Sequence, residues 1–244
     1  MIDSLPIGAF FSAQALVNAV DADVAVLCKA GNRVTAVTIG DLFLKRYNYF
    51  SRWDRFRYNF ITPRPWKNFL ISEILRAGNV ETPEVFAALR KRKGIYVEND
   101  FLVSSAVPEC WKFANRKIFS SLPDEERRQL VVKIVELLCR IHALGVVHGD
   151  PSLRNFYYRR GNDDFVIGVA DLDGALSFAG GKIPESLRCR EIARLVTALD
   201  DDPAFPDAEE LVVGSYIGFS GVTPERKKVA KYMARFRTHR KVKK

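Results

Sequence analysis

Residues 146–155 read Val-Val-His-Gly-Asp-Pro-Ser-Leu-Arg-Asn, and residues 165–174 read Phe-Val-Ile-Gly-Val-Ala-Asp-Leu-Asp-Gly. Together they restrict the structure more than any other part of the chain. Asp150 and Asn155 stand on one expected loop, which leads through Phe156-Tyr-Tyr and a short turn into the second run. This pattern predicts a β-hairpin that ends at Asp171. Because a hairpin returns the chain to its starting point, we expect two carboxylates and one amide oxygen to converge.

Such a group of side chains suits phosphoryl transfer. That chemistry needs a base for the acceptor hydroxyl, a ligand for one Mg²⁺ ion and a ligand for metal between the β- and γ-phosphates. The alternative is a turn with a chance His-x-Asp, which the surrounding strand, loop and hairpin make less favoured. In this setting we expect His148 to brace the loop rather than to carry a proton.

The composition indicates a globular protein. A chain of 244 residues with 48% hydrophobic content can bury a sizeable core, as one large domain or as two fused lobes. Its four cysteines form no Cys-x-x-Cys pair, so neither a zinc site nor a disulfide framework is expected, and we expect reduced thiols in a cytosolic protein. The chain opens without a basic segment, and no apolar run approaches the roughly 20 residues that span a bilayer. Secretion and membrane insertion are therefore not expected.

The net charge of +9 is concentrated at one end. Residues 222–244 hold ten Lys or Arg and one Glu, a net +9, which leaves 28 basic and 28 acidic residues in the rest of the chain. The apolar residues Val229, Tyr232, Met233 and Phe236 predict an amphipathic helix over residues 224–238. Its basic face either stays in water or turns toward phosphates or an anionic membrane. We expect a combination, with the apolar stripe docked and residues 237–244 free to reach the membrane.

Short apolar runs over residues 23–46 predict three strands, with a tight hairpin at Gly31-Asn32. Lys45 is expected to close the third strand. There it would serve either as an ammonium for the α- and β-phosphates of a nucleotide or as an ordinary edge lysine, and the motif downstream favours the first. The turn over residues 29–33 would cover the phosphates, although it has only one glycine.

Residues 47–67 interleave aromatic side chains with arginines. They either grip an anionic, sugar-bearing acceptor or pack an irregular insertion between a strand and a helix. A helix is expected from about Pro65 to Arg76, before Ala77-Gly78. Glu73 is the only acid of this helix, so it is the candidate partner for Lys45, unless it is an exposed helix residue.

Residues 84–107 predict two more strands, which complete a five-stranded N-terminal lobe over residues 1–107. The segment 103–108 would form a hinge to a second lobe over residues 108–244. A helix is then expected from Leu122 to Leu144. Its expected buried stripe consists of Leu130, Val131, Ile134, Leu137, Leu138 and Ile141.

The sequence from Leu138 through His-Gly-Asp150 to Asn155, with Asp171-Leu-Asp-Gly after a hairpin, resembles the bacterial lipopolysaccharide core kinases. These are the Kdo and heptose kinases, and the His-Gly-Asp-Pro-x-x-x-Asn-Phe form looks most like the heptose(II) kinase branch. The resemblance runs from about Leu42 to Leu199. It implies an α+β, two-lobed, protein-kinase-like fold with a five-stranded N-terminal lobe and a mainly helical C-terminal lobe.

By this resemblance Asp150 is the catalytic base, Asn155 and Asp171 are Mg²⁺ ligands, and Lys45 holds the phosphates of ATP. The sequence departs from the kinase pattern around Glu73, which stands close to the end of its helix, so its pairing with Lys45 is in doubt. Asp173 also replaces the glycine of Asp-Phe-Gly.

The implied reaction is transfer of the γ-phosphoryl group of ATP to a hydroxyl of a core heptose, or of Kdo. The resemblance also implies a cytoplasmic protein whose acceptor is lipopolysaccharide core at the inner membrane. The basic tail, by its own charge, predicts peripheral contact with an anionic membrane through Arg237–Lys244, and no nucleic-acid partner is expected. Two alternatives remain open, namely a small-molecule phosphotransferase of the aminoglycoside or choline type and a non-catalytic kinase-like binding protein. A protein kinase is less favoured because no Ala-Pro-Glu segment follows Gly174.

Overall fold

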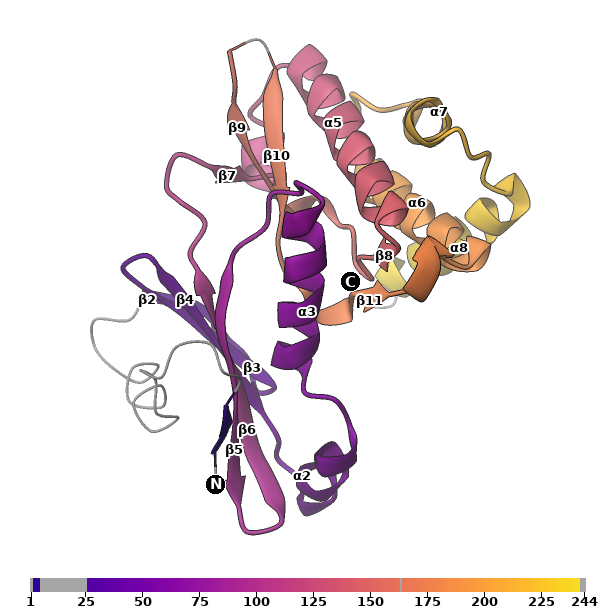
Figure 1. Cartoon of the computed structure of the whole chain (residues 1–244). Helices are drawn as coiled ribbons and strands as arrows, with labels where there is room; N and C mark the ends of the chain where they lie inside the picture. The colour runs from indigo at the N-terminus through magenta and orange to yellow at the C-terminus, as the bar shows by residue number, and fades with distance from the viewer. Residues whose placement is uncertain (1, 5–25, 163, 242–244) are drawn as a thin grey trace. The chain divides into compact units, whose positions relative to one another are not determined.

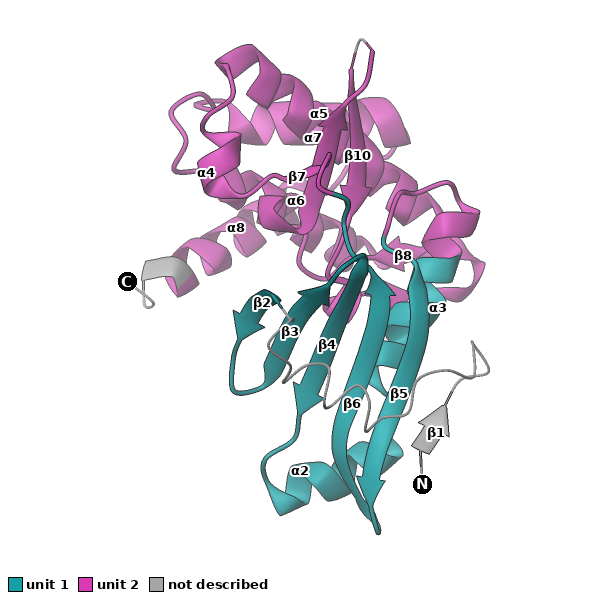
Figure 2. Ribbon diagram, turned by 90° about the vertical axis from the view of Figure 1, so that its left-hand side faces the viewer, with its two compact units in different colours: residues 1–73, 83–108 teal, residues 74–82, 109–244 magenta. Residues whose placement is uncertain are grey.

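The computed structural model describes residues 2–4, 26–162 and 164–241, and side chains are described for residues 26–162 and 164–239. The chain forms two compact units (Figures 1 and 2). Unit 1 comprises Met1–Glu73 and Pro83–Pro108, and unit 2 comprises Ile74–Thr82 and Glu109–Lys244. The segment 74–82, which the sequence assigned to the first lobe, groups with unit 2.

Unit 1 is built on one antiparallel sheet (Figure 2). Its strands, in spatial order, are β1 (Ile2–Ser4), β5 (Val85–Lys93), β6 (Tyr96–Ser105), β4 (Leu42–Asn48), β3 (Val34–Ile39) and β2 (Val26–Ala30). The five expected strands are confirmed, and β1 adds an edge strand that was not expected. Lys45 lies in the middle of β4 rather than at its end, because β4 continues to Asn48.

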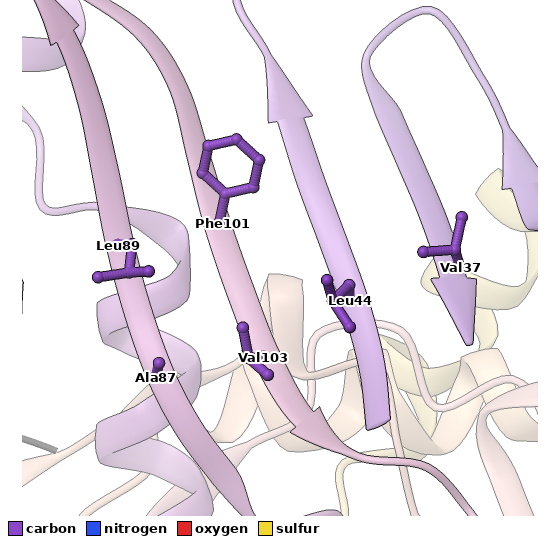
Figure 3. Packing of buried hydrophobic residues seen from close by; sticks show 6 residues of the cluster. All are labelled: Val37, Leu44, Ala87, Leu89, Phe101 and Val103. Atoms are coloured by element: carbon purple, nitrogen blue, oxygen red, sulfur yellow. The ribbon is translucent and has the colours of Figure 1, made fainter. Parts of the chain in front are cut away.

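Two apolar clusters lie on the sheet, as expected for strands whose side chains alternate between faces. Figure 3 shows the cluster of Val37, Leu44, Ala87, Leu89, Phe101 and Val103. The other cluster contains Tyr47, Tyr49, Val85, Val97 and Leu102, and Phe69 from α3 (Arg64–Ala77) packs against it. The helix α3 is confirmed to within one residue at each end.

The insertion before α3 is more regular than the sequence suggested. It contains α2 (Arg52–Arg57) and the 3₁₀ turn η1 (Tyr58–Phe60). Ser51 caps α2, because its side-chain oxygen accepts a hydrogen bond of 2.9 Å from the backbone N–H of Asp54. No residue of α2 is buried, so its sequence lacks the apolar periodicity from which a helix is predicted.

Unit 2 is mainly helical. Its helices are α4 (Arg116–Phe119), α5 (Asp124–Ala143), α6 (Glu185–Leu199), α7 (Ala208–Ser220) and α8 (Arg226–Lys241). Its strands are β7 (Lys112–Phe113), β8 (Val146–Val147), β9 (Phe156–Arg160), β10 (Phe165–Val169) and β11 (Leu176–Ser177). Its 3₁₀ turns are η2 (Leu153–Asn155), η3 (Leu172–Gly174) and η4 (Ala179–Gly181). The hairpin of β9 and β10 and the helix α5 are confirmed, and every residue of the expected stripe of α5 is buried.

The C-terminal helix α8 is confirmed, and it packs against α6 (Figure 1). Val229 and Met233 are buried, whereas Tyr232 and Phe236 are half-buried. One expectation about the tail is wrong, because Arg237 is not free. Its Nε and NH2 atoms lie 2.9 Å and 2.7 Å from the two carboxylate oxygens of Asp200. Residues 242–244 lie outside the described part of the chain, and in that part no helix combines the length and apolarity needed to cross a membrane.

Candidate active site

The expected loop runs from His148 to Asn155, between β8 and β9, and we call it the 148–155 loop. Backbone pairing fixes both of its ends. At the start, β8 pairs with β11, with Val147 opposite Leu176. At the end, the N–H of Ala170 donates a hydrogen bond of 2.8 Å to the carbonyl oxygen of Asn155. The structure thus brings the 148–155 loop and the segment 170–176 together, as the hairpin pattern predicted.

His148 connects the same two segments through its side chain. Its ring nitrogen Nε2 lies 3.1 Å from the carbonyl oxygen of Ala170, and the residue is almost fully buried. Its Nδ1 lies 3.4 Å from the backbone nitrogen of Asp150. A ring held at both nitrogens by backbone groups positions the loop, which agrees with the bracing role expected from the sequence.

Gly149 sits where only a glycine fits. Its φ angle is +90°, and a Cβ atom at this position would clash with the carbonyl oxygen of Gly174. The backbones of the 148–155 loop and of η3 are therefore in direct contact at this point. This contact holds the residue before Asp150 against the segment that follows Asp171.

Asn155 is buried within the loop and faces Asp150. Its Nδ2 atom donates a hydrogen bond of 2.8 Å to the backbone carbonyl of Asp150, and its own backbone N–H donates 2.9 Å to Ser152. An amide that donates through its nitrogen keeps its oxygen as an acceptor for a cation. The oxygen of this amide is therefore not used by the hydrogen bond to Asp150.

Asp171 follows Ala170 directly and adopts the left-handed conformation, with φ 59° and ψ 60°. This region is uncommon for residues other than glycine and costs free energy, so it is found mainly where the surrounding structure enforces it. Here the β9–β10 hairpin enforces it from one side and η3 from the other. The structure therefore places Asp171 beside the backbone of Asn155, through the bond between Ala170 and Asn155.

The carboxylate of Asp150 is held by two arginines. Arg194 of α6 donates from Nε to Oδ1 at 2.8 Å, and Arg154 lies 3.3 Å from Oδ2. Partial burial would raise the pKa of Asp150, but the hydrogen bond from Arg194 and the charges of both arginines outweigh it, so the pKa lies below its ordinary value. Asp150 is thus kept ionised, and one of its oxygens is fixed in direction.

A second acid, Glu191 of α6, holds the start of the 148–155 loop through hydrogen bonds to its backbone. Its carboxyl group accepts hydrogen bonds from the backbone N–H groups of His148, at 3.0 Å, and of Gly149. The ring of His142 joins it, with Nε2 2.9 Å from Glu191 and Nδ1 2.8 Å from the hydroxyl of Tyr216. The sequence reading assigned no role to Glu191 or Arg194. The available signal was an acidic residue on the same helix face as the apolar residues Leu187 and Leu195, four positions away on either side. In the structure Glu191 is 2% exposed.

A cleft of about 930 Å³ opens beside Asp150 within unit 2. Arginines dominate its wall, and Phe236 of α8 contributes an apolar surface. The cleft arginines are Arg116, Arg154, Arg190, Arg194 and Arg237. Three of them are paired with Asp150 or Asp200, but Arg116 and Arg190 are exposed and form no ion pair with any described residue. These two guanidinium groups are therefore available to an anionic group of a ligand.

Lys45 and Glu73, the other expected site residues, belong to unit 1. Lys45 is buried at 8% exposure on β4, opposite Ala36 and Leu102, and its ammonium lies 5.5 Å from the centre of the Tyr47 ring. A lysine is rarely buried to this degree without a function or a partner. Glu73 is exposed on α3. The proposed pairing of the two residues stays a prediction.

The residues present fit a magnesium ion better than a metal held by protein groups alone. Among the described residues, no three or more His, Cys, Asp or Glu side chains gather into a metal-binding group. Mg²⁺ needs no such cage, because in phosphoryl-transfer enzymes it binds one or two carboxylates together with substrate phosphates and water. Asn155 and Asp171, joined through Ala170, offer a set of that kind.

The chain is similar to known proteins over the region that contains these residues. The model of the lipopolysaccharide kinase (Kdo/WaaP) family matches residues 41–183, more than half of the chain, a range that includes Lys45, the 148–155 loop and Asp171. No curated protein matches the chain significantly.

Solved structures establish the fold. WaaP in complex with acyl carrier protein aligns over 89% of this chain and 89% of its own, with a TM-score of 0.63 and 17% sequence identity. Glucosamine kinase in complex with glucosamine, ADP and inorganic phosphate aligns over 90% of this chain and 78% of its own, with a TM-score of 0.56 and 12% identity. The expected α+β, kinase-like fold is thereby confirmed.

Proposed function

Because the chain belongs to the lipopolysaccharide kinase (Kdo/WaaP) family, we propose that it transfers the γ-phosphoryl group of ATP to a sugar hydroxyl of the lipopolysaccharide inner core. The observation that carries this proposal is the ionised Asp150, fixed by Arg194 at the edge of a cleft lined with arginines. A heptose is the proposed acceptor sugar, with Kdo as the alternative. The proposed place of action is the cytoplasmic face of the inner membrane.

Asp150 is proposed as the base. In phosphoryl transfer the protein does little covalent chemistry, so the rate comes from positioning and from charge. The Oδ1 atom of Asp150 accepts a hydrogen bond of 2.8 Å from Arg194, whereas Oδ2 has longer contacts, 3.3 Å to the exposed Arg154 and 3.5 Å to Ser152. We therefore assign to Oδ2 the role of orienting the acceptor hydroxyl and accepting its proton late in the reaction. A carboxylate with a lowered pKa is a weak base, and a late proton transfer needs no stronger one.

Asn155 and Asp171 are proposed to bind Mg²⁺, and Lys45 to bind the phosphates of ATP. When bound, the metal ion neutralises charge on the β- and γ-phosphates. The protein contributes orientation at this site. The amide of Asn155 is held by its hydrogen bond to the carbonyl of Asp150, and the backbone of Asp171 is held in the left-handed conformation.

Arg116 and Arg190 favour an acceptor that carries negative charge. Their guanidinium groups suit carboxylate or phosphate groups of an acceptor. A cationic amine, such as an aminoglycoside or choline, would be repelled by the same side chains. The cleft thus favours a lipopolysaccharide acceptor over the small-molecule alternative.

The test is a phosphotransfer assay with ATP, Mg²⁺ and deacylated core oligosaccharide, in which mass spectrometry locates the added phosphate. The wild-type protein should add one phosphate to a core sugar. Asp150→Asn should keep ATP binding and lose roughly 10²- to 10⁴-fold in turnover, the usual effect of a positioned general base. Near wild-type transfer by this variant, or the absence of transfer by the wild-type protein, would refute the proposal.

A further inference from the structure

The insertion of unit 1 exposes an unusual group of aromatic side chains. Phe50, Trp53, Phe56 and Phe60 are exposed to 63%, 67%, 37% and 77%, respectively. Together with Arg52, Arg57 and Arg64, which are also exposed, we call this group the aromatic–arginine surface. Single exposed apolar residues are ordinary, but four large rings within eleven residues of sequence form a patch that normally has a binding role.

Three of these rings, those of Trp53, Phe56 and Phe60, form a continuous row. The ring centres of Trp53 and Phe56 lie 6.2 Å apart, and those of Phe56 and Phe60 lie 5.4 Å apart. Ile95, at 64% exposure in the β5–β6 turn, adjoins them, because Asn59 donates a hydrogen bond of 2.6 Å to its carbonyl oxygen. Figures 1 and 2 show α2 and the β5–β6 turn at the same end of the sheet. The patch is therefore one surface at one end of unit 1.

The backbone beneath the rings is firmly anchored. Arg90 of β5 donates to both carboxylate oxygens of Asp100, at 2.8 Å and 3.0 Å, and to the carbonyl oxygen of Tyr58. Tyr49 donates to the same carboxylate at 2.7 Å and stacks on Tyr58, with ring centres 4.1 Å apart. These buried contacts hold both ends of the segment against the sheet. The outward rings are thus part of the fold, and they do not belong to a loosely attached loop.

The charge around the rings has one sign. Residues 50–67 contain five basic residues and one acid, Asp54, a net +4. Asp54 is paired with Arg57 at 3.2 Å, and Arg52 and Arg64 form no ion pair with a residue that the structure describes. The surface therefore combines exposed aromatic rings, which can make apolar contacts, with arginines, which can bind anionic groups.

We propose that the aromatic–arginine surface docks the protein on a bilayer that contains anionic lipid. Tryptophan and phenylalanine insert at the boundary between headgroups and acyl chains, and arginines attract the phosphates above it. An anionic bilayer presents both kinds of partner in one plane. This contact requires no nucleotide and no catalysis, so it stands independently of the proposed function.

The docking test is co-sedimentation of the full-length protein with vesicles of phosphatidylethanolamine and phosphatidylglycerol, against vesicles of phosphatidylcholine alone. The wild-type protein should bind the anionic vesicles, and salt should weaken the binding because it screens the arginines. Trp53→Ala with Phe60→Ala should lower the partition coefficient about tenfold or more, because two exposed rings no longer insert. Arg52→Glu should weaken binding to the anionic vesicles only.

Matched controls separate this surface from general effects. Phe219→Ala removes an exposed ring from α7, and Lys117→Glu reverses an exposed charge on α4, and both should leave vesicle binding unchanged. The Trp53/Phe60 variant should keep the stability of the wild-type protein, since both rings are exposed. Three results would overturn the proposal: no binding of the wild-type protein to anionic vesicles, equal binding by the double variant, or an equal loss in the controls. Binding of an acidic protein by this surface, without binding to vesicles, would also overturn it.

Discussion

At the scale of single residues, the main tension in the site is at Asp150. A base should attract a proton, yet Arg194 and Arg154 hold its pKa below the ordinary value. A low pKa is compatible with the role of a base if the position of the Asp150 carboxylate matters more than its proton affinity. The guanidinium of Arg194 that binds Oδ1 also fixes the direction of Oδ2. Arg194 then acts through Asp150 as a positioning residue, and this role can be separated from a purely structural one by pH.

The first prediction concerns Arg194→Gln. The carboxyl of Asp150 is active when ionised, and its lowered pKa keeps it ionised below the usual range, so the acid limb of the kcat/KM profile of the wild-type protein should lie below the ordinary aspartate pKa. Without Arg194, burial remains and raises the pKa, so this limb should shift to higher pH. Arg188→Gln, six residues earlier on α6, is the control and should leave the limb unchanged. An unshifted limb in Arg194→Gln would assign Arg194 to packing alone.

The second prediction concerns two glycines that face each other. Gly149 has φ +90° and no room for a Cβ atom, whereas a Cβ at Gly174 would lie 3.6 Å from the Cα of Gly149, an ordinary contact. Gly149→Ala should therefore lose transfer activity and about 1–3 kcal/mol of unfolding free energy, from overpacking and backbone strain. Gly174→Ala should be nearly neutral. Urea unfolding measures the change in stability, and the transfer assay measures the change in activity. Equal effects of the two substitutions would contradict the close backbone contact of Gly149 with Gly174.

At the scale of elements, the helix α6 supplies the hydrogen-bond partners that hold the 148–155 loop in place. The 148–155 loop begins with two backbone N–H groups, those of His148 and Gly149, that donate hydrogen bonds to Glu191. Arg194, nearly one turn further along α6, supplies the donor for Asp150. One helix thus sets both the backbone and the side chain of the proposed base, since residues three apart share a helix face.

The third prediction concerns Glu191→Ala. This change leaves the N–H groups of His148 and Gly149 and one nitrogen of His142 without their acceptor, and each buried unpaired donor costs about 1–3 kcal/mol. We expect a loss of at least about 3 kcal/mol in unfolding free energy, together with loss of transfer. Glu136→Gln, in a partly exposed pair with Lys133 on α5, should change stability by less than about 1 kcal/mol. A Glu191 variant as stable as the Glu136 variant would show that the loop supports itself.

Elements that are determined by neighbouring residues could be predicted from the sequence. Elements and contacts that depend on residues far away in the sequence could not. The loop and hairpin of the site were predictable because Asp150, Asn155 and Asp171 are placed by short-range turns. The contact of Arg194 with Asp150 spans 44 residues of sequence, and no local pattern contains it. The short strand β1 gains its place only by pairing with β5, and α2 is held by a cap and by Tyr49 rather than by an apolar stripe.

At the scale of the whole molecule, the proposed machinery is divided between two units. The proposed base and metal ligands belong to unit 2, and the proposed ATP-phosphate lysine belongs to unit 1. Each unit has its own apolar core, so a substitution at one part of the site should leave the other unit folded. Lys45 is the informative residue for unit 1, because it is buried on β4 and is the residue of this unit that is proposed to bind the phosphates of ATP.

The fourth prediction tests Lys45 and Glu73 together. Lys45→Met should raise the KM for ATP and lower kcat, because an ammonium on the phosphates acts in both the ground state and the transition state. If Glu73 orients Lys45, Glu73→Gln should resemble Lys45→Met, and the double variant should be no worse than either single one. The pair Lys91 and Glu98, 3.4 Å apart on neighbouring strands, provides a matched control cycle that should leave both kinetic constants unchanged. Strictly additive effects of the Lys45 and Glu73 changes would make Glu73 a surface residue and leave Lys45 as the part of unit 1 that acts on ATP. Wild-type kinetic constants in Lys45→Met would show that Lys45 does not act on the phosphates of ATP.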